Sequence, residues 1–197
     1  MEDLYDHVER KQCECLNADE SFPLSNAIDR EAREDDEKFL KSDCDAQLLL
    51  HIAFQQIVKI HSIVIYTCQK HRAVGPKKIA LFVNKPHLDF SSCESEKTSQ
   101  EMELTDDLLD GRPLELKFTS FQNVSSLSIL VKGNMSGDED EPTIISKLSF
   151  LGFTTNIEGR KRTLEEQKAA CELTCSTSCF YSTNPLTSLS DQLPAIG

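Results

Sequence analysis

The chain has 197 residues, 39% of them hydrophobic and 27% charged, so it is long enough for one domain with a substantial core and has an ordinary globular composition. Its net charge is −12, and residues 1–45 hold 15 Asp and Glu against 6 Lys and Arg, which excludes nucleic acid as an expected partner because phosphates would be repelled. No apolar run approaches the ~18 residues of a membrane span, and the acidic start has no secretory-signal pattern, so no membrane partner is expected either.

Residues 1–38 are expected to be mostly irregular. Four apolar side chains in this stretch are candidate anchors onto the body of the domain: Leu4, Tyr5, Val8 and Leu16. Residues 26–38 have only Ile28 and Ala32 as an apolar stripe. A solvated loop with a helical turn is therefore at least as good an interpretation of residues 26–38 as a short helix.

The longest apolar segment, residues 39–66, has a period of two, which is typical of strands. One predicted face carries Leu48, Leu50, Ile52 and Phe54, and the other carries Leu49, His51, Ala53 and Gln55. After the polar pair Gln55-Gln56 a second alternating run sets Ile57, Lys59, His61, Ile63 and Ile65 against Val58, Ile60, Ser62 and Val64. We expect two adjacent central strands, entered through an acidic turn at residues 42–45. A buried helix is the alternative, but it fits this β-branched alternation poorly.

Shorter alternating runs follow, separated by turn residues. Strands are expected at residues 78–84, 102–104, 114–118, 126–132 and 143–153, with an exposed loop at residues 91–100. The run at residues 114–118 places Leu114, Leu116 and Phe118 together. At least seven strands without helical crossovers predict an all-β, antiparallel sandwich or barrel.

The pattern changes from Glu158, and we divide the chain into a domain at residues 1–156 and a C-terminal tail at residues 157–197. Thr163 and Glu166 have the spacing of a capping box. A short helix is therefore expected over residues 163–175, and the remainder is expected to be disordered.

No catalytic arrangement is visible in the chain. The five histidines lack metal-ligand spacing, although His51 and His61 would approach each other if the two central strands form a hairpin. The GxSxG, P-loop and GxGxxG motifs are absent. We therefore expect no enzyme activity, no catalytic residue, no cofactor and no metal ion.

The eight cysteines lack the CxxC spacing of a thioredoxin-type redox site, in which the second thiol resolves a mixed disulfide. Cys13 and Cys15 are closer together than that geometry requires. Cys171, Cys175 and Cys179 would line one helical face and are one ligand short of a tetrahedral zinc site. In a chain without a secretory signal, all eight are expected to be free thiols or small apolar side chains in the core.

Several ordered stretches resemble the PITH (proteasome-interacting thioredoxin) domain family. They are CECLN at residues 13–17, FLKSDCDAQLL at 39–49, VKIHSI at 58–63, PKKIALFVN at 76–84, KFTSFQNV at 117–124 and LSFLG at 148–152. The resemblance covers about residues 4–156, which is the whole predicted sandwich. We expect the chain to depart from the family in two respects: a stand-alone module without a preceding thioredoxin domain and its CxxC, and a tail after Asn156 that is unlike the usual ending.

The resemblance implies a jelly-roll β-sandwich similar to galactose-binding-like domains. It also implies a non-enzymatic module that associates with the 26S proteasome regulatory particle, in cytoplasm and nucleus, and it supplies no catalytic residues. A monomer is expected. Two alternatives stay open: a carbohydrate- or ligand-binding jelly roll, disfavoured by the absence of Trp and the presence of only three Tyr, and a thiol-redox accessory protein.

Acidic side chains gather at three places that we expect to be exposed turns or loops. A structural calcium in such loops is an alternative, but none follows the EF-hand pattern. Loops held by a rigid scaffold are usual recognition sites, so the acidic residues are our candidates for partner binding: Asp35, Asp36, Glu37, Asp43, Asp45, Asp138, Glu139, Asp140 and Glu141.

Overall fold

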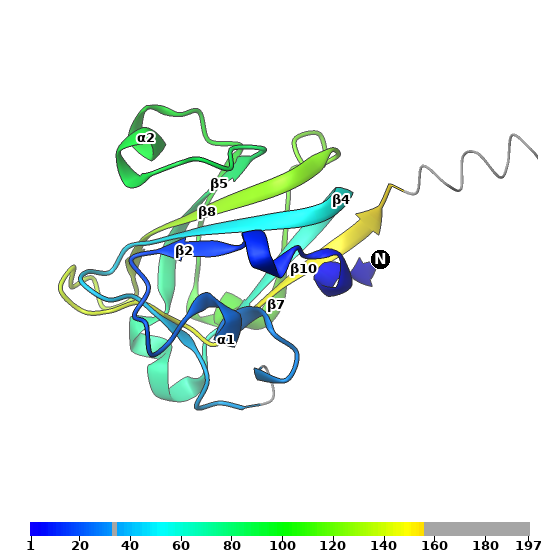
Figure 1. Cartoon of the computed structure of the whole chain (residues 1–197). Coiled ribbons are helices and arrows are strands. Elements are labelled where there is room, and N and C mark those ends of the chain that lie inside the picture. Colours follow the sequence, from blue (N-terminus) through cyan, green and yellow to red (C-terminus); the bar gives the residue numbers. More distant parts are fainter. Residues whose placement is uncertain (33–34, 156–197) are drawn as a thin grey trace, which may run out of the picture. The chain divides into compact units, whose positions relative to one another are not determined.

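The structure, a computed structural model, describes residues 1–32 and 35–155 (Figure 1). The predicted tail, with its expected helix at 163–175 and Cys171, Cys175 and Cys179, lies outside the described residues. The strands are β1 (Glu2–Asp3), β2 (Glu14–Leu16), β3 (Leu40–Lys41), β4 (Leu48–Tyr66), β5 (Pro76–Val83), β6 (Gln100–Glu103), β7 (Asp110–Glu115), β8 (Val124–Asn134), β9 (Ile144–Ile145) and β10 (Lys147–Thr154). The α-helices are α1 (Leu24–Ile28) and α2 (Phe90–Ser95), and short 3-10 helices cover Leu4–His7, Arg10–Gln12, Gln69–Val74 and Asp106–Leu109.

Strand β4 organises the fold. Residues 49–51 pair with β2 on one side and residues 48–53 with β8 on the other, whereas residues 58–66 pair mainly with β10 and β7. Every pairing between strands is antiparallel, and the main sheet has the order β1-β10-β4-β8-β5-β6. The prediction of an antiparallel β-sandwich is confirmed. The prediction of two strands was wrong, because Gln55 and Gln56 continue the extended chain instead of turning it.

The alternation along β4 shifts its phase at His61. In the register with β10, Ser62 lies opposite Leu151 and Ile60 opposite Gly152, so His61 is an extra residue, a β-bulge. Before the bulge Val58 and Ile60 join the main core, and after it Ile63 and Ile65 do. The expectation that Ile57, Lys59, His61, Ile63 and Ile65 share one face was therefore wrong.

The main core lies on the face of β4 that carries Leu48, Leu50, Ile52 and Phe54, as predicted. A second, smaller core covers the opposite face of the sheet and contains Leu49, Ala80, Phe82, Leu88, Cys93 and Leu130. Helix α2 supplies Cys93 to this second core, and Asp89 caps the helix by accepting a hydrogen bond from the Ser92 N–H. The prediction of a wholly exposed loop at residues 91–100 was wrong in this respect.

Two other predictions concern the edges of the domain. Leu4, Tyr5 and Val8 are buried, and Leu16 packs on the second core, so the predicted anchors are confirmed. Strand β7 ends at Glu115, and the side chain of Phe118 is 67% exposed. Phe118 therefore does not continue the inward row of Leu114 and Leu116, contrary to our expectation.

Candidate functional site

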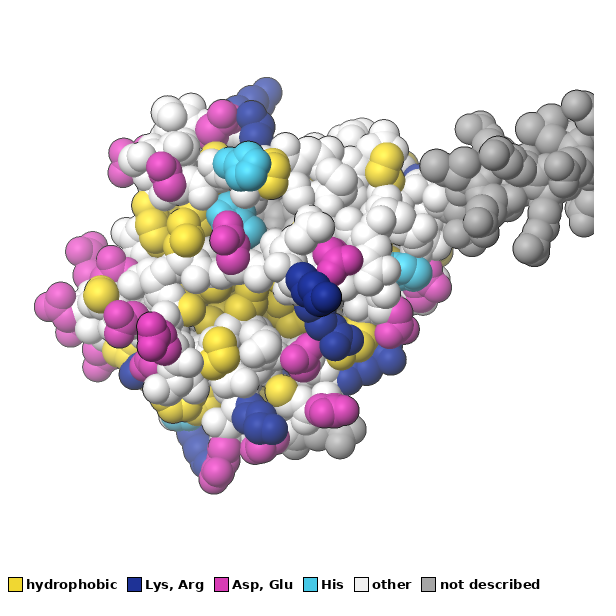
Figure 2. Space-filling view, in the orientation of Figure 1, with side chains coloured by type: hydrophobic (Ala, Val, Ile, Leu, Met, Phe, Trp, Pro, Cys, Tyr) yellow, Lys and Arg dark blue, Asp and Glu magenta, His cyan; other side chains and the backbone are white. Residues whose placement is uncertain are grey.

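Two of the predicted acidic segments lie side by side at one end of the sandwich. The Ala46 N–H donates to the Glu139 carbonyl oxygen over 3.0 Å. Close by, the Ser42 N–H donates to the Thr143 carbonyl oxygen, and the Thr143 N–H donates to Ser42 Oγ over 2.8 Å. The two loops lie together at the left of Figure 1, and Figure 2 shows acidic side chains gathered at that end. We call residues 43–45 and 138–141 the acidic end.

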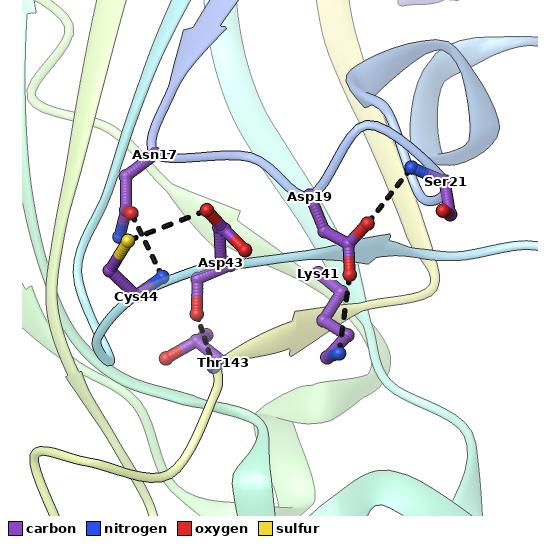
Figure 3. A network of polar contacts seen from close by, with 8 residues as sticks. Asn17, Asp19, Ser21, Lys41, Asp43, Cys44 and Thr143 are labelled. Carbon is purple, nitrogen blue, oxygen red and sulfur yellow. Dashed lines mark hydrogen bonds and ion pairs between the residues drawn. The ribbon is translucent and has the colours of Figure 1, made fainter.

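Asn17 holds the first acidic loop in place from outside it (Figure 3). Its Oδ1 accepts from the Cys44 N–H over 3.2 Å, and its Nδ2 donates to Asp45 Oδ1 over 2.8 Å and to the Gln47 carbonyl oxygen over 2.6 Å. Asn17 has φ of 64°, a left-handed conformation that Asn tolerates better than most residues. Sequence reasoning did not assign this role to Asn17.

Asn134 has the same role for the second acidic loop. Its buried side chain donates to the Glu141 carbonyl oxygen over 2.8 Å and accepts from Ser136 Oγ and from the Gly137 N–H. Gly137 has φ of 77°, a conformation that favours glycine. Asp138 closes the turn by accepting from the Asp140 N–H over 3.0 Å. Both acidic loops are therefore held in defined conformations.

The negative charge of the acidic end changes the pKa of the one thiol within it, Cys44. Cys44 is exposed, and its Sγ donates to Asp43 over 3.4 Å (Figure 3). This hydrogen bond and the repulsion from the Asp43 carboxylate raise the pKa of Cys44. Asp19 differs, because hydrogen bonds from Ser21 and the nearby Lys41 ammonium lower its pKa. Lys41 and Asp19 are 3.3 Å apart, so part of the charge beside the acidic end is already neutralised.

The third predicted segment, residues 35–37, makes contacts of a different kind. Asp35 pairs with Lys38 over 3.9 Å, and Asp36 pairs with Lys147 over 3.7 Å at the start of β10. Of the three candidate segments, the structure thus joins residues 43–45 to residues 138–141, whereas Asp35 and Asp36 in the third segment pair with lysines.

No metal-binding group forms in the described part of the chain: nowhere do three His, Cys, Asp or Glu side chains gather to hold an ion. His51 is buried, with Nδ1 2.8 Å from Ser128 Oγ and Nε2 3.0 Å from the Leu88 carbonyl oxygen. His51 thus fastens the segment before α2 to the sheet. His51 and His61 do not approach each other, because they lie ten residues apart on one extended strand, roughly 33 Å.

The thiols do not form a redox site among the described residues, where all five cysteines are free. Burial raises the pKa of Cys15 to about 12 and also raises the pKa of Cys13. The thiolate is the nucleophile in thiol–disulfide exchange. Both cysteines are therefore held in the unreactive form at neutral pH, which counts against the redox alternative.

A polar groove of about 440 Å³ lies beside His51 and is lined in part by Gln12, Glu14, His87 and Ser126. Its aromatic lining residue, Phe54, is 8% exposed and belongs to the main core. Sugar sites use exposed aromatic rings as platforms, so this groove does not favour the carbohydrate alternative.

Comparison with known proteins settles the family. The PITH domain profile matches residues 1–170. The chain belongs to the PITH domain family. It is 36% identical over 148 residues to thioredoxin-like protein 1 of Schizosaccharomyces pombe, covering 74% of this chain and 49% of that protein. It is 30% identical over 136 residues to human PITH domain-containing protein 1, covering 68% of this chain and 63% of that protein. The chain thus spans about half to two thirds of the length of these relatives.

Solved structures confirm the fold of this PITH domain. The carbohydrate-binding module CBM32-5 from Clostridium perfringens superposes with a TM-score of 0.57 at 8% identity, covering 77% of this chain and all of that one. The family 32 module of NanJ from the same organism gives 0.52 at 13% identity, covering 73% and 97%. At such identities the likeness shows the β-sandwich alone. No helix within residues 1–32 and 35–155 is long and apolar enough to cross a membrane.

Proposed function

We propose that this PITH domain is a non-enzymatic protein-binding module that associates with the 26S proteasome regulatory particle in cytoplasm and nucleus. Membership of a family named for proteasome interaction supports the partner. The observation that carries the site is the acidic end, where two loops are fastened to each other through Ala46, Glu139, Ser42 and Thr143. A recognition surface that is ordered before binding loses less entropy when it binds.

The chemistry of the acidic end specifies a basic partner surface. Asp43, Glu139, Asp140 and Glu141 carry carboxylates on exposed loops of a chain with a net charge of −12. Opposite charges accelerate encounter and select the partner more than they add raw affinity. The association should therefore weaken as salt rises and the screening length falls from about 10 Å to about 3 Å.

The test is a binding titration of the chain against purified 26S proteasome. Glu139→Lys with Glu141→Lys reverses two charges at the acidic end and spares Asp45 and Asp138, whose side chains hold the loops. Glu103→Lys with Asp107→Lys is the control, with the same change in net charge on other exposed segments. We expect the first variant to bind at least about tenfold more weakly at 0.15 M salt and the control to bind like the parent.

A parent chain that does not bind purified proteasome would refute the proposed function. Equal binding of the parent and both variants would leave the association standing and remove the acidic end as its site. Reversal of Asp35, Asp36 and Glu37 to Lys tests the third candidate segment in the same titration. Because Asp36 already pairs with Lys147, we expect a smaller effect there.

A further inference from the structure

The large hydrophobic side chains that remain exposed are not scattered over the described surface. Among residues 1–32 and 35–155 they are Met1, Ile57, Phe118 and Phe153, with exposed fractions of 64%, 44%, 67% and 48%. Single exposed hydrophobic residues are normal on a monomer, whereas a contiguous group marks an interaction site. The relative positions of these four side chains therefore decide whether they form an interaction site.

Ile57 and Phe153 lie on paired strands at the end of the sheet where β10 finishes. Phe153 is opposite Lys59 in the register of β10 with β4, and the Thr155 N–H donates to the Ile57 carbonyl oxygen over 3.3 Å. Val58 is fully buried, so its neighbours Ile57 and Lys59 point away from the core. Phe153 and Ile57 are thus diagonal neighbours on the outer face, within reach of each other.

Met1 extends this row on the other side of β10. The register of β1 with β10 places Glu2 opposite Gly152 and Asp3 opposite Leu151. One step further along the same antiparallel register places Met1 beside Phe153. The start of the chain and the end of β10 lie close together at the right of Figure 1.

Phe118 comes from the loop that borders β4 at the same level. The Leu116 N–H donates to the His61 carbonyl oxygen over 2.9 Å, and the Ile60 N–H donates to the Phe121 carbonyl oxygen over 3.0 Å. Leu116 and Phe121 turn into the core, while Phe118 between them is mostly exposed. Met1, Ile57, Phe118 and Phe153 therefore come from neighbouring segments, and we call them the apolar patch.

Two lysines lie at the apolar patch although the chain as a whole is acidic, and the acidic neighbour of Met1, Glu2, accepts from Thr154 Oγ1 over 3.5 Å. Lys59 lies opposite Phe153, and Lys117 precedes Phe118. Among the described residues neither lysine has an acidic side chain within ion-pair distance. Their ammonium groups are available to carboxylates of a partner. The acidic end, in contrast, requires a basic partner surface.

We propose that the apolar patch is a second contact surface of the module, and that it binds an apolar segment of a regulatory-particle subunit whose flanking side chains are Asp or Glu. This inference rests on the proposed function and adds to it a site of different chemistry. Phe118 and Phe153 are the anchors, because buried aromatic side chains dominate the energetics of interfaces. Lys59 and Lys117 fix the orientation of the segment by pairing with its carboxylates.

The experiment is a titration of purified 26S proteasome with the full chain and three variants. Phe118→Ser removes an anchor, Phe118→Leu keeps an apolar side chain, and Lys59→Glu with Lys117→Glu reverses the rim. Lys70→Glu with Lys97→Glu is the control for the charge reversal, since both lysines are exposed and lie on other segments. Melting curves establish that each variant folds, as expected for exposed positions.

We expect Phe118→Ser and the rim variant each to bind at least about tenfold more weakly, with Phe118→Leu and the Lys70/Lys97 control within about threefold of the parent. If the parent binds and Phe118→Ser and the rim variant bind equally well, the apolar patch is refuted while proteasome association stands. If the parent itself does not bind, both proposals fall together. An effect of Phe118→Leu as large as that of Phe118→Ser would refute the apolar nature of the contact.

Discussion

Gly152 lies so close to Lys59 that a Cβ atom at position 152 would overlap the Lys59 carbonyl oxygen. This close approach accompanies the bulge at His61, where β4 carries one residue more than β10. The sequence stretch LSFLG at residues 148–152 thus ends in a glycine for a steric reason.

Replacement of Gly152 by Ala should destabilise the domain by about 2–4 kcal/mol, because backbone rather than a flexible side chain must move. Gly133→Ala is the matched control, since a Cβ there meets no atom within 4 Å. Chemical denaturation of both variants measures the difference in free energy of unfolding. Equal stability of the two variants would show that β4 and β10 can move apart at the bulge without a loss of free energy of unfolding.

The main core gives a second prediction. Ile52→Asp or Ile129→Asp should unfold the domain, because a buried, unpaired carboxylate costs several kcal/mol against a total stability of ~5–15 kcal/mol. Ile52 is fully buried and Ile129 is 1% exposed. Ala53→Asp, on the opposite face of the same strand, should fold. Circular dichroism at rising temperature distinguishes these cases, and an unshifted melt for both Ile variants would contradict the assignment of the core.

Asn17 gives a prediction that separates its backbone from its side chain. Asn17→Ala loses the hydrogen bonds to residues 44–47 and strains the left-handed backbone, and should cost about 1–3 kcal/mol. Asn17→Gly keeps the backbone conformation and loses only the side-chain bonds, so its loss should be smaller. Thermal melts compare the two variants. A Gly variant less stable than the Ala variant would contradict the role of the positive φ.

The alkylation rate of Cys44 gives a measure of the negative electrostatic potential at the acidic end. Asp43 raises the pKa of Cys44 by accepting its hydrogen bond and by repelling the thiolate. Asp43→Asn removes the negative charge, so the pKa of Cys44 should fall and the thiolate fraction at pH 8 should rise. Alkylation of Cys44 by iodoacetamide, followed by mass spectrometry, should be faster in the variant. Buried Cys68 is the internal reference, and an unchanged rate at Cys44 would contradict the electrostatic assignment.

Much of the fold was predictable because local patterns and the fold agree. The period of two from Leu48 to Phe54 predicted both the strand and its inward face. The pattern failed at Gln55-Gln56 because a polar pair marks exposure as well as a turn, and at His61 because the bulge depends on the partner residue Gly152. The prediction that Phe118 shares a face with Leu114 and Leu116 failed because the alternation of side chains does not reveal where a strand ends.

Of the candidate site, only the acidic residues could be predicted from the sequence. The acidic residues are visible in the sequence, but the contact of Ala46 with Glu139 joins positions far apart in the chain. Asn17 and Asn134, which hold the acidic loops, resemble any surface asparagine until their partners are known. The apolar patch is likewise assembled by strand register rather than by sequence proximity.

The length of β4 and the sequence positions of its partner strands also affect the risk of aggregation during synthesis. This risk lasts until both partner strands have been synthesised. Strand β4 emerges from the ribosome as nineteen residues of mainly apolar, β-branched sequence, whereas its partners β8 and β10 end at Asn134 and Thr154. At ~5–20 residues per second, roughly 5–20 seconds pass before both partners are available. Throughout that interval β4 has an edge without its strand partner, so we expect nascent chains of this domain to bind chaperones that recognise extended apolar segments.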